Sequence, residues 1–369
     1  MPPKKILLVA NTAWNLWNYR RALTRALQDA GFEVVLAAPG DRFISLLETR
    51  FVSLQHLSRR SFSFFQNLRT LVELYRLFRR ERPAVVLLYT VKPNILGNLA
   101  AWLAHSPTIS VVEGLGHSGT SAARWRWLAA PLYRLALRSA RRVIVLNRDD
   151  EQAFLYQKIA APAQIVVIPG PGVDTDYFCP PPTPRRTSSP TVFLFCGRLL
   201  SEKGIHEFVE AAQMVSRSGW EAEFRVLGSP DPGNPATVLE EQVRDWQQAG
   251  IVQFIGAADD VRPHLAEADV LILPSYYREG VPRSVLEAMA MEKIIVTTDT
   301  PGCRDTVDAG KNGFLIPPRR ADLLAQIMLH ILALPPDEWS VMGKYSRTKV
   351  IREFSDAVVL PQYMALLNI

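Results

Sequence analysis

The sequence predicts an α/β fold made of two doubly wound domains. Short runs of β-branched and other apolar residues alternate with longer amphipathic helical patterns, which is typical of parallel sheets covered by helices. This alternation stops at a Pro- and Gly-rich segment between residues 169 and 190 and then begins again. A chain of 369 residues is also too long for one ordinary core and suits two domains of similar size.

The first predicted domain, residues 1–170, is Rossmann-like. Its buried parallel strands are expected at 6–10, 34–38, 85–89, 109–113, 143–146 and 165–168. Helical patterns lie between them, among them 19–30, 68–80 and 124–137. The linker is expected at 171–190, because the prolines and glycines there cannot continue a helix or a sheet.

The second predicted domain, residues 191–353, repeats the pattern. Its strands are expected at 192–196, 224–227, 252–255, 270–273, 294–297 and 314–316. The helical segment from about 354 to 369 carries an apolar series and is expected to pack back on the first domain. Ligands bind at the carboxyl ends of strands in such folds, so the cleft between the two domains is the expected site.

Composition favours a soluble protein. Hydrophobic residues make up 48% and charged residues 21% of the chain, and the sequence has no run of about 18 uncharged apolar residues that would span a membrane. Cys179, Cys196 and Cys303 lie far apart, which fits a reducing cytoplasm without structural zinc. The six histidines show no metal-ligand spacing, so no metal is expected.

The positive charge belongs to the first half of the chain. Residues 1–178 carry a net charge of +11 and residues 179–369 a net charge of −5. The segments 68–80 and 124–142 combine apolar and Arg-rich faces, and Phe64 and Phe65 precede the first of them. These features predict docking on an anionic membrane surface. Nucleic acid is not an expected partner, because no known binding motif is present.

Two motifs point to chemistry that their context does not support. Residues 114–119 match the dinucleotide pattern G-x-G-x-x-G, but no acidic residue follows from 120 to 148 to bind a ribose. We interpret them as a loop at the cleft. Asp174 and Asp176 match the D-x-D of metal-dependent sugar transferases, but they lie in the Gly- and Pro-rich linker, where Asp favours a turn.

The segment 273–290 carries the strongest functional signal. A buried strand is followed by a loop with Glu279 and Gly280, and Pro282 then suits the first turn of a helix. The helix start and its dipole create an anion site without a metal. Its amide donors are expected at Arg283, Ser284 and Val285. Glu287, further along the helix, is placed to accept hydrogen bonds from neutral hydroxyls such as those of a ribose.

The segment 195–204 supplies fixed cations. It again reads as a strand, a loop and a helix start, with Gly197 in the loop. Arg198 offers two donors to a diphosphate and Lys203 adds a point charge. Such groups stabilise the negative charge that builds on a departing nucleoside diphosphate.

Taken together, these residues resemble family four of the retaining glycosyltransferases, the glycosyl transferases of group 1. Glu279 and Glu287 stand in its E-x7-E spacing, and Gly197, Arg198 and Lys203 match its diphosphate motif. The likeness extends over nearly the whole chain and is strongest to bacterial enzymes that extend glycans on polyprenyl diphosphate. Further matching segments are 11–21, 90–94, 113–116, 259–261, 301–307 and 312–314.

The resemblance implies a GT-B fold, with the acceptor on the first domain and the donor on the second. Glu279 would face the donor sugar, and Arg198, Lys203 and His117 would join it in catalysis. Donor-binding residues would be Gly197, Arg198, Lys203, Gly256, Glu279, Gly280, Val281, Pro282, Arg283, Ser284, Val285 and Glu287. Acceptor or cleft loops would contain Asn11, Asn15, Asn18, Lys92, Asn94, Gly114, Gly116 and His117.

The implied activity is retaining, metal-independent transfer of a sugar, with an N-acetylhexosamine as one candidate, from a UDP-linked donor. The acceptor would be a polyprenyl-diphosphate-linked glycan or another surface-polysaccharide acceptor, at the inner face of a bacterial plasma membrane. No cofactor is expected beyond the nucleotide sugar itself. A soluble sugar-nucleotide transferase or epimerase of the same fold, and a non-enzymatic nucleotide-sugar-binding protein, remain the alternatives.

Overall fold

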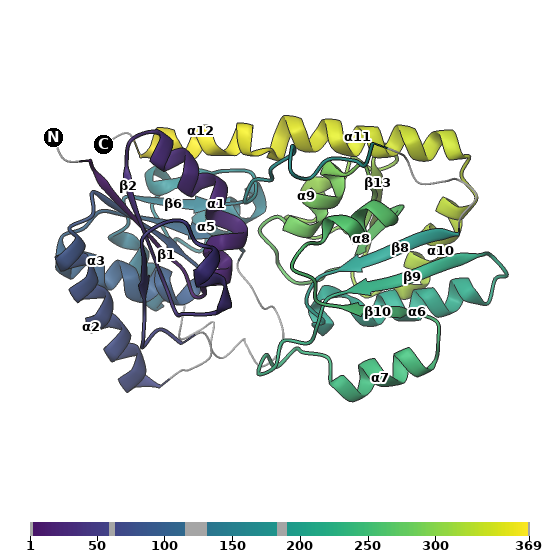
Figure 1. Cartoon of the computed structure of the whole chain (residues 1–369), viewed down its shortest axis with the longest axis horizontal. Helices are drawn as coiled ribbons and strands as arrows, with labels where there is room; N and C mark the ends of the chain where they lie inside the picture. Colours follow the sequence, from purple (N-terminus) through teal and green to yellow (C-terminus); the bar gives the residue numbers. More distant parts are fainter. Residues whose placement is uncertain (1–2, 59–62, 115–130, 183–189, 368–369) are drawn as a thin grey trace. The chain divides into compact units, whose positions relative to one another are not determined.

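A computed structural model describes residues 3–58, 63–114, 131–182 and 190–367. The chain divides into two compact units (Figure 1). The first contains Met1–Gly172 together with Val359–Ile369, and the second contains Val173–Val358. The last helix, α12 (Asp356–Leu366), therefore contributes most of its length to the first unit. Within the described ranges, no helix is both long enough and apolar enough to cross a membrane.

The first unit is a seven-stranded parallel sheet in the order β3-β2-β1-β4-β5-β6-β7, with helices on both faces (Figure 1). Its strands are β1 (Lys5–Val9), β2 (Glu33–Ala38), β3 (Phe51–Ser53), β4 (Val85–Tyr89), β5 (Thr108–Val112), β6 (Arg142–Val145) and β7 (Ile165–Val167). Its helices are α1 (Ala13–Asp29), η1 (Arg42–Leu46), α2 (Phe64–Glu81), η2 (Pro93–Gly97), α3 (Asn98–Ala104), α5 (Arg148–Tyr156) and η3 (Pro162–Gln164).

The core of this unit follows the predicted patterns. Leu74, Leu77 and Phe78 of α2 pack with alternate residues of β1, β2 and β4 and with alanines of α3. The predicted strands agree with the observed ones to within one residue at each end. Beyond the predicted set, the structure contains β3, which is short and only half-buried, so its hydrophobic pattern was too weak to predict it.

Two predicted helices of this unit differ from the structure. The helix expected at 19–30 begins earlier, at Ala13, because the Thr12 side chain accepts a hydrogen bond from the Asn15 amide at 3.1 Å and caps it. The helix expected at 68–80 likewise begins at Phe64. Of the helix expected at 124–137, residues 124–130 lie outside the described ranges, and residues 131–138 are helical.

The second unit is a six-stranded parallel sheet in the order β10-β9-β8-β11-β12-β13. Its strands are β8 (Thr191–Cys196), β9 (Ala222–Leu227), β10 (Gln253–Gly256), β11 (Val270–Leu273), β12 (Ile294–Thr298) and β13 (Gly313–Ile316). Its remaining elements are η4 (Ser201–Lys203), α6 (Ile205–Ser216), α7 (Glu240–Gln248), α8 (Arg262–Glu267), α9 (Arg283–Ala290), η5 (Arg304–Thr306), α10 (Ala321–Leu332) and α11 (Pro336–Phe354). These strands agree with the prediction to within two residues at each end. The fold is thus doubly wound in both units, as predicted.

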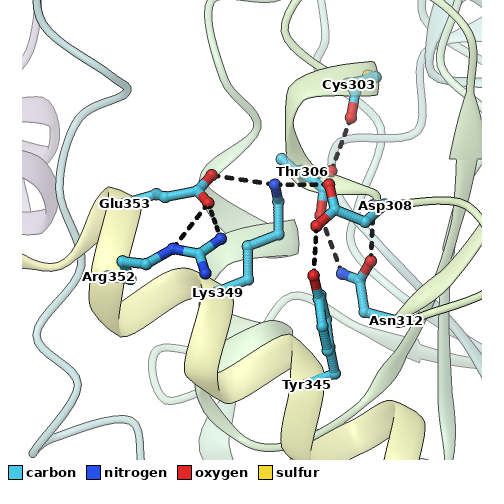
Figure 2. A network of polar contacts seen from close by, with 8 residues as sticks. All are labelled: Cys303, Thr306, Asp308, Asn312, Tyr345, Lys349, Arg352 and Glu353. Atoms are coloured by element: carbon cyan, nitrogen blue, oxygen red, sulfur yellow. Dashed lines mark hydrogen bonds and ion pairs between the residues drawn. The ribbon is translucent and has the colours of Figure 1, made fainter.

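A polar network fixes α11 to the loop between β12 and β13 (Figure 2). The buried Lys349 ammonium donates to Asp308 at 2.9 Å and to Glu353 at 3.0 Å. Tyr345 donates to the other oxygen of Asp308 at 2.8 Å, and Asn312 accepts from the Asp308 amide at 2.8 Å. Burial alone would raise the pKa of Asp308, but its hydrogen bonds from Lys349 and Tyr345 outweigh burial and hold that pKa below its ordinary value.

We expect Lys349→Met to lower the free energy of unfolding by roughly 1–3 kcal/mol, because it leaves Asp308 without its buried ammonium partner. The loss is smaller than for a fully buried pair, since Asp308 is about one third exposed. Arg352→Met is the matched control, because Arg352 also contacts Glu353 but from an exposed position. Urea denaturation followed by tryptophan fluorescence measures both variants. Equal stability of the two variants would contradict this role for Lys349.

Candidate active site

The candidate residues of the second unit lie at the point where the strand order of its sheet reverses. β8 and β11 are neighbours, and the chain winds outward from them in opposite directions. Arg198 and Lys203 follow β8, and Glu279 follows β11. In open α/β sheets, the crevice at the carboxyl ends of such strands is the place where ligands bind.

Lys203 and Glu279 are brought into direct contact. The Lys203 Nζ donates to Glu279 Oε1, and both side chains are largely buried. The buried Ser275 hydroxyl donates to the same carboxylate oxygen at 3.0 Å. Lys203 also lies over the ring of Tyr277, 5.7 Å from its centroid. The sequence predicted that these two charged residues belong to one site, but their pairing with each other was not predicted.

The backbone holds the two loops together. The Glu202 carbonyl accepts from the Tyr276 amide at 2.9 Å and from the Tyr277 amide at 3.0 Å. Gly204 has a φ of +80°, and a Cβ on it would lie 2.2 Å from the carbonyl oxygen of Pro274. Only glycine allows this approach without strain. Lys203 and Glu279 therefore lie on two loops that close backbone contacts hold together.

The 301–307 segment supports the Glu279 loop from the other side. Gly302 has a φ of +79°, and a Cβ on it would lie 1.9 Å from the carbonyl oxygen of Gly280. The Thr298 hydroxyl donates to the Ser275 carbonyl, and Thr297 donates to that of Leu273 at 2.7 Å. The Pro-Gly-Cys-Arg motif thus has a packing role beside the predicted donor residues.

Arg198 has a partner that the sequence did not reveal. Its Nη1 donates at 2.8 Å to the carboxylate of Asp231, which is buried after β9. Gly197 and Gly256 lie close to this strand edge: the Gly197 amide donates to the Leu227 carbonyl at 3.0 Å, and the Gly256 carbonyl accepts from Gly228 at 2.8 Å. Nothing in the sequence pattern marked Asp231, because 33 residues separate it from Arg198.

The start of α9 differs in one respect from the prediction. Pro282 caps the helix, and its carbonyl accepts from the Val285 amide at 3.1 Å. The expectation of an uncommitted Val285 amide was therefore wrong, because the first turn closes with a short-range bond. Val281 is buried and Ser284 half-buried at this loop–helix junction.

Glu287 is buried on α9 beside an arginine of the same helix. Arg283 Nε donates to its carboxylate at 3.0 Å, an i,i+4 pair. Burial raises the pKa of the Glu287 carboxyl, and the nearby Arg283 charge opposes that rise without cancelling it. A buried carboxylate with one cationic partner keeps lone pairs that are suited to neutral hydroxyl donors.

The predicted acceptor residues of the first unit have mixed surroundings. Asn18 is exposed and Asn11 half-buried. Lys92 donates to the Ser58 carbonyl at 2.6 Å, and burial lowers its pKa. Asn15 and Asn94 are buried, and the Asn94 side chain donates to the Val111 carbonyl at 2.9 Å, which joins η2 to β5.

Three further predictions concern loops. Gly114 follows β5 with a φ of +114°. Gly116 and His117 lie outside the described residues. Asp174 shapes a turn, as predicted: its Oδ1 accepts from the amides of Asp176 at 3.1 Å and Tyr177 at 2.9 Å.

Comparison with protein families identifies both units. Residues 16–171 match the glycosyl transferase 4-like domain, and residues 190–333 match the glycosyl transferases group 1 domain. The chain belongs to the glycosyl transferases of group 1. The resemblance inferred from Glu279, Glu287 and the Arg198–Lys203 segment is thereby confirmed at the level of the family.

Similar curated proteins are bacterial glycosyltransferases. The chain is 27% identical over 343 residues, which cover 88% of it and 89% of the relative, to the N,N'-diacetylbacillosaminyl-diphospho-undecaprenol alpha-1,3-N-acetylgalactosaminyltransferase of Campylobacter jejuni. It is 25% identical over 309 residues, 80% of it and 78% of the relative, to the UDP-Gal:alpha-D-GlcNAc-diphosphoundecaprenol alpha-1,3-galactosyltransferase of Escherichia coli.

Similar solved structures confirm the GT-B architecture. Sucrose-phosphate synthase from Thermosynechococcus elongatus has a TM-score of 0.82 at 22% identity, covering 99% of this glycosyltransferase and 98% of that chain. The Anabaena protein HepE, solved in complex with UDP and glucose, has a TM-score of 0.81 at 19% identity and covers 99% of both chains. At such identities, the likeness concerns the fold alone.

The raised pKa of Glu287 predicts a pH-dependent stability difference. A carboxyl whose pKa is higher in the folded state than in the unfolded state loses stability as the pH rises from about 4.3 through the raised value. Glu287→Gln does not titrate. We therefore expect its melting temperature, relative to that of the wild type, to increase over that window and to level off above it. Calorimetry between about pH 4 and 8 tests this, and a pH-independent or decreasing difference would contradict the burial effect.

Proposed function

We propose that this glycosyltransferase moves a sugar, with retention and without a metal ion, from a UDP-linked donor to a polyprenyl-diphosphate-linked glycan. The donor binds to the second unit and the acceptor to the first. The observation that carries the proposal is the arrangement of Arg198, Lys203 and Glu279 at the reversal point between β8 and β11.

The donor assignment rests on charge and position. Arg198 and Lys203 follow the same strand, and α9 begins in the loop after the neighbouring strand. A diphosphate placed there meets two fixed cations and a helix N-terminus, which stabilise the charge of the leaving group as it forms. Cations in these positions replace the divalent ion that other transferases use. The UDP bound to HepE fits this choice of donor.

The acceptor assignment rests on the relatives. Two of them, from Campylobacter jejuni and Escherichia coli, are named for acting on sugars linked to diphospho-undecaprenol, and the chain covers more than three quarters of each. The relatives add different sugars, an N-acetylgalactosamine and a galactose. We therefore propose only the class of acceptor, and the experiment below uses both sugars as donors.

The first test is transfer from UDP-galactose or UDP-N-acetylgalactosamine to undecaprenyl-diphosphate-linked N-acetylglucosamine in excess EDTA. We expect transfer to persist, with the donor's anomeric configuration retained in the product by NMR. Arg198→Ala and Lys203→Ala should each reduce kcat by about 10²–10³, because they remove charge-assisted contacts to the leaving group. The exposed Arg217→Ala is the control and should keep full activity.

The outcomes of this test separate the alternatives. Activity that EDTA abolishes and manganese restores would contradict metal independence. Conversion of the donor to an epimer without transfer would identify an epimerase, and tight UDP-sugar binding without turnover would identify a binding protein. Near-normal turnover in both cation variants would contradict the assignment of Arg198 and Lys203.

We further propose that the first unit docks on the anionic inner face of a bacterial plasma membrane. Phe64 and Phe65 at the start of α2 are each 74% exposed. The exposed positions of α2 continue with Leu68, Arg69, Val72, Arg76 and Arg79. Apolar side chains between arginines suit the headgroup region, where each basic residue contributes about 1 kcal/mol. Trp102 on α3, which packs beside α2 in the same core, is also exposed.

Flotation with vesicles tests this surface. Wild-type protein should float with phosphatidylglycerol vesicles, float less with phosphatidylcholine vesicles, and lose binding as salt rises, because the attraction is partly Coulombic. Replacing Arg76 and Arg79 by Glu should abolish flotation. The control replaces the exposed Arg217 and Arg244 of the second unit by Glu and should float like the wild type. Equal effects of the two double variants would contradict a specific docking face.

A further inference from the structure

The first unit contains a largely buried ion pair that joins a helix to the end of a strand. Arg20 of α1 is 2% exposed, and its guanidinium donates to the carboxylate of Glu113, the residue that follows β5. Removing the Arg20 charge from water costs several kcal/mol, and its attraction to the partly exposed Glu113 can offset only part of that cost. Replacing such pairs by hydrophobic residues is often neutral or stabilising, so stability alone does not explain the pair.

Its position in the sheet is that of a ligand site. The strand order of the first unit reverses between β1 and β4. Arg20 lies on the helix that follows β1, Tyr89 ends β4, and Glu113 follows β5, the neighbour of β4. In the second unit, Lys203 and Glu279 form their own ion pair at the corresponding reversal between β8 and β11. Ligands bind at such reversals in doubly wound sheets.

The surroundings of the pair are polar and incompletely satisfied. The Arg20 guanidinium lies over the ring of Tyr89, 4.0 Å from its centroid. Tyr363, from the C-terminal segment, is also buried. Burial raises the pKa of its hydroxyl to about 12, and the nearby charges of Arg20 and Glu113 act on the same pKa in opposite directions. Among the described residues, the hydroxyls of Tyr89 and Tyr363 and the Nε of Arg20 have no hydrogen-bond partner. Buried polar atoms without a partner are rare in proteins and point to a ligand or solvent contact.

The two members of the pair differ in solvent exposure. Glu113 is 25% exposed, whereas Arg20 is almost completely buried. Arg20 contacts Oε1 of Glu113, so the carboxylate retains acceptor capacity on its second oxygen. Because its charge is compensated from within, it is suited to accept from neutral hydroxyls. A phosphate group would instead be repelled by it.

We propose that Glu113 binds a hydroxyl of the acceptor sugar and that Arg20 is the positioning residue that holds its carboxylate in place. This rests on the proposed function, because it assigns the acceptor to the first unit. In this proposal, Glu113 contacts the sugar that receives the new bond, and the diphosphate of the acceptor binds away from this carboxylate because their negative charges repel each other. Arg20 acts through Glu113 and does not itself touch the acceptor.

The experiment compares Glu113→Gln with Glu81→Gln, using undecaprenyl-diphosphate-linked N-acetylglucosamine as the acceptor. Glu81 is the matched control, because it is also a buried carboxylate of this unit and accepts from Arg50 at 2.9 Å. It precedes β4 and so lies at the amino ends of the strands, away from Glu113 at the carboxyl ends. Glu113→Gln should raise the acceptor KM by about 10- to 100-fold, the range for a lost hydrogen bond to a charged group. Its donor KM and its hydrolysis of donor without acceptor should not change. Glu81→Gln should lower the melting temperature and leave the acceptor KM unchanged.

Two further variants separate positioning from folding. Arg20→Met should raise the acceptor KM as Glu113→Gln does, and Arg20→Lys should recover part of it, because an ammonium restores the charge but not the fork geometry. Glu113→Asp keeps the charge, withdraws the carboxylate by one methylene, and should also raise the acceptor KM. An unchanged acceptor KM in folded, active Glu113→Gln and Glu113→Asp would overturn this inference alone. Absence of transfer by the wild type would overturn it together with the proposed function.

Discussion

The contact between Lys203 and Glu279 joins two loops that leave neighbouring strands of the second sheet. Its position depends on backbone packing that leaves no room for a Cβ: Gly204 against Pro274 on one side, and Gly302 against Gly280 on the other. These carbonyl contacts fix the backbone of both loops, so that only the side chains have to adjust when a ligand arrives. Preorganised charges are worth more to a developing negative charge than mobile ones, since no reorganisation accompanies the reaction.

The two candidate cations of this site are each paired with a carboxylate, Arg198 with Asp231 and Lys203 with Glu279, and the nearby Arg283 is paired with Glu287. A cluster of unpaired cations in a half-buried crevice would repel itself and lose hydration, which destabilises the folded unit. Pairing removes that cost and keeps each cation in a defined direction. Under the proposed function, the diphosphate of the donor would therefore compete with these carboxylates for the cations, which would limit its affinity before the sugar is transferred.

The fold could be predicted well because strands and helices are encoded by patterns of neighbouring residues. Strands such as β4 and β11 are continuous apolar runs, and their limits agree with the prediction. The candidate site could be proposed from the sequence where its residues follow a short motif, as with Arg198, Lys203 and Glu279. Asp231, Arg20 and Tyr363 were not predicted as members of any site, because their partners are distant in sequence and only the sheet order brings them together. The Val285 amide was misjudged because a helix start can close with a short-range bond that no residue pattern encodes.

The two sheets each hold a cation–carboxylate pair, but the pairs differ in which groups are exposed. Both sheets reverse their strand order beside the first strand of the unit, and both have a cation–carboxylate pair close to that reversal. Lys203 and Glu279 follow β8 and β11, whereas Arg20 follows β1 and Glu113 follows β5. In the second unit, both members of the pair are largely buried, and Arg198, 46% exposed, adds a second cation after the same strand. The exposed part of the Arg198 guanidinium, which also pairs with Asp231, suits the diphosphate of the proposed donor. In the first unit, the cation is buried and the carboxylate reaches the surface, so the group offered to a ligand is an acceptor of hydrogen bonds. Under the proposed function, the donor leaves with negative charge and the acceptor presents a neutral hydroxyl, so the two ligands need groups of opposite kind. The second unit offers the partly exposed Arg198 cation, whereas the first offers the partly exposed Glu113 carboxylate.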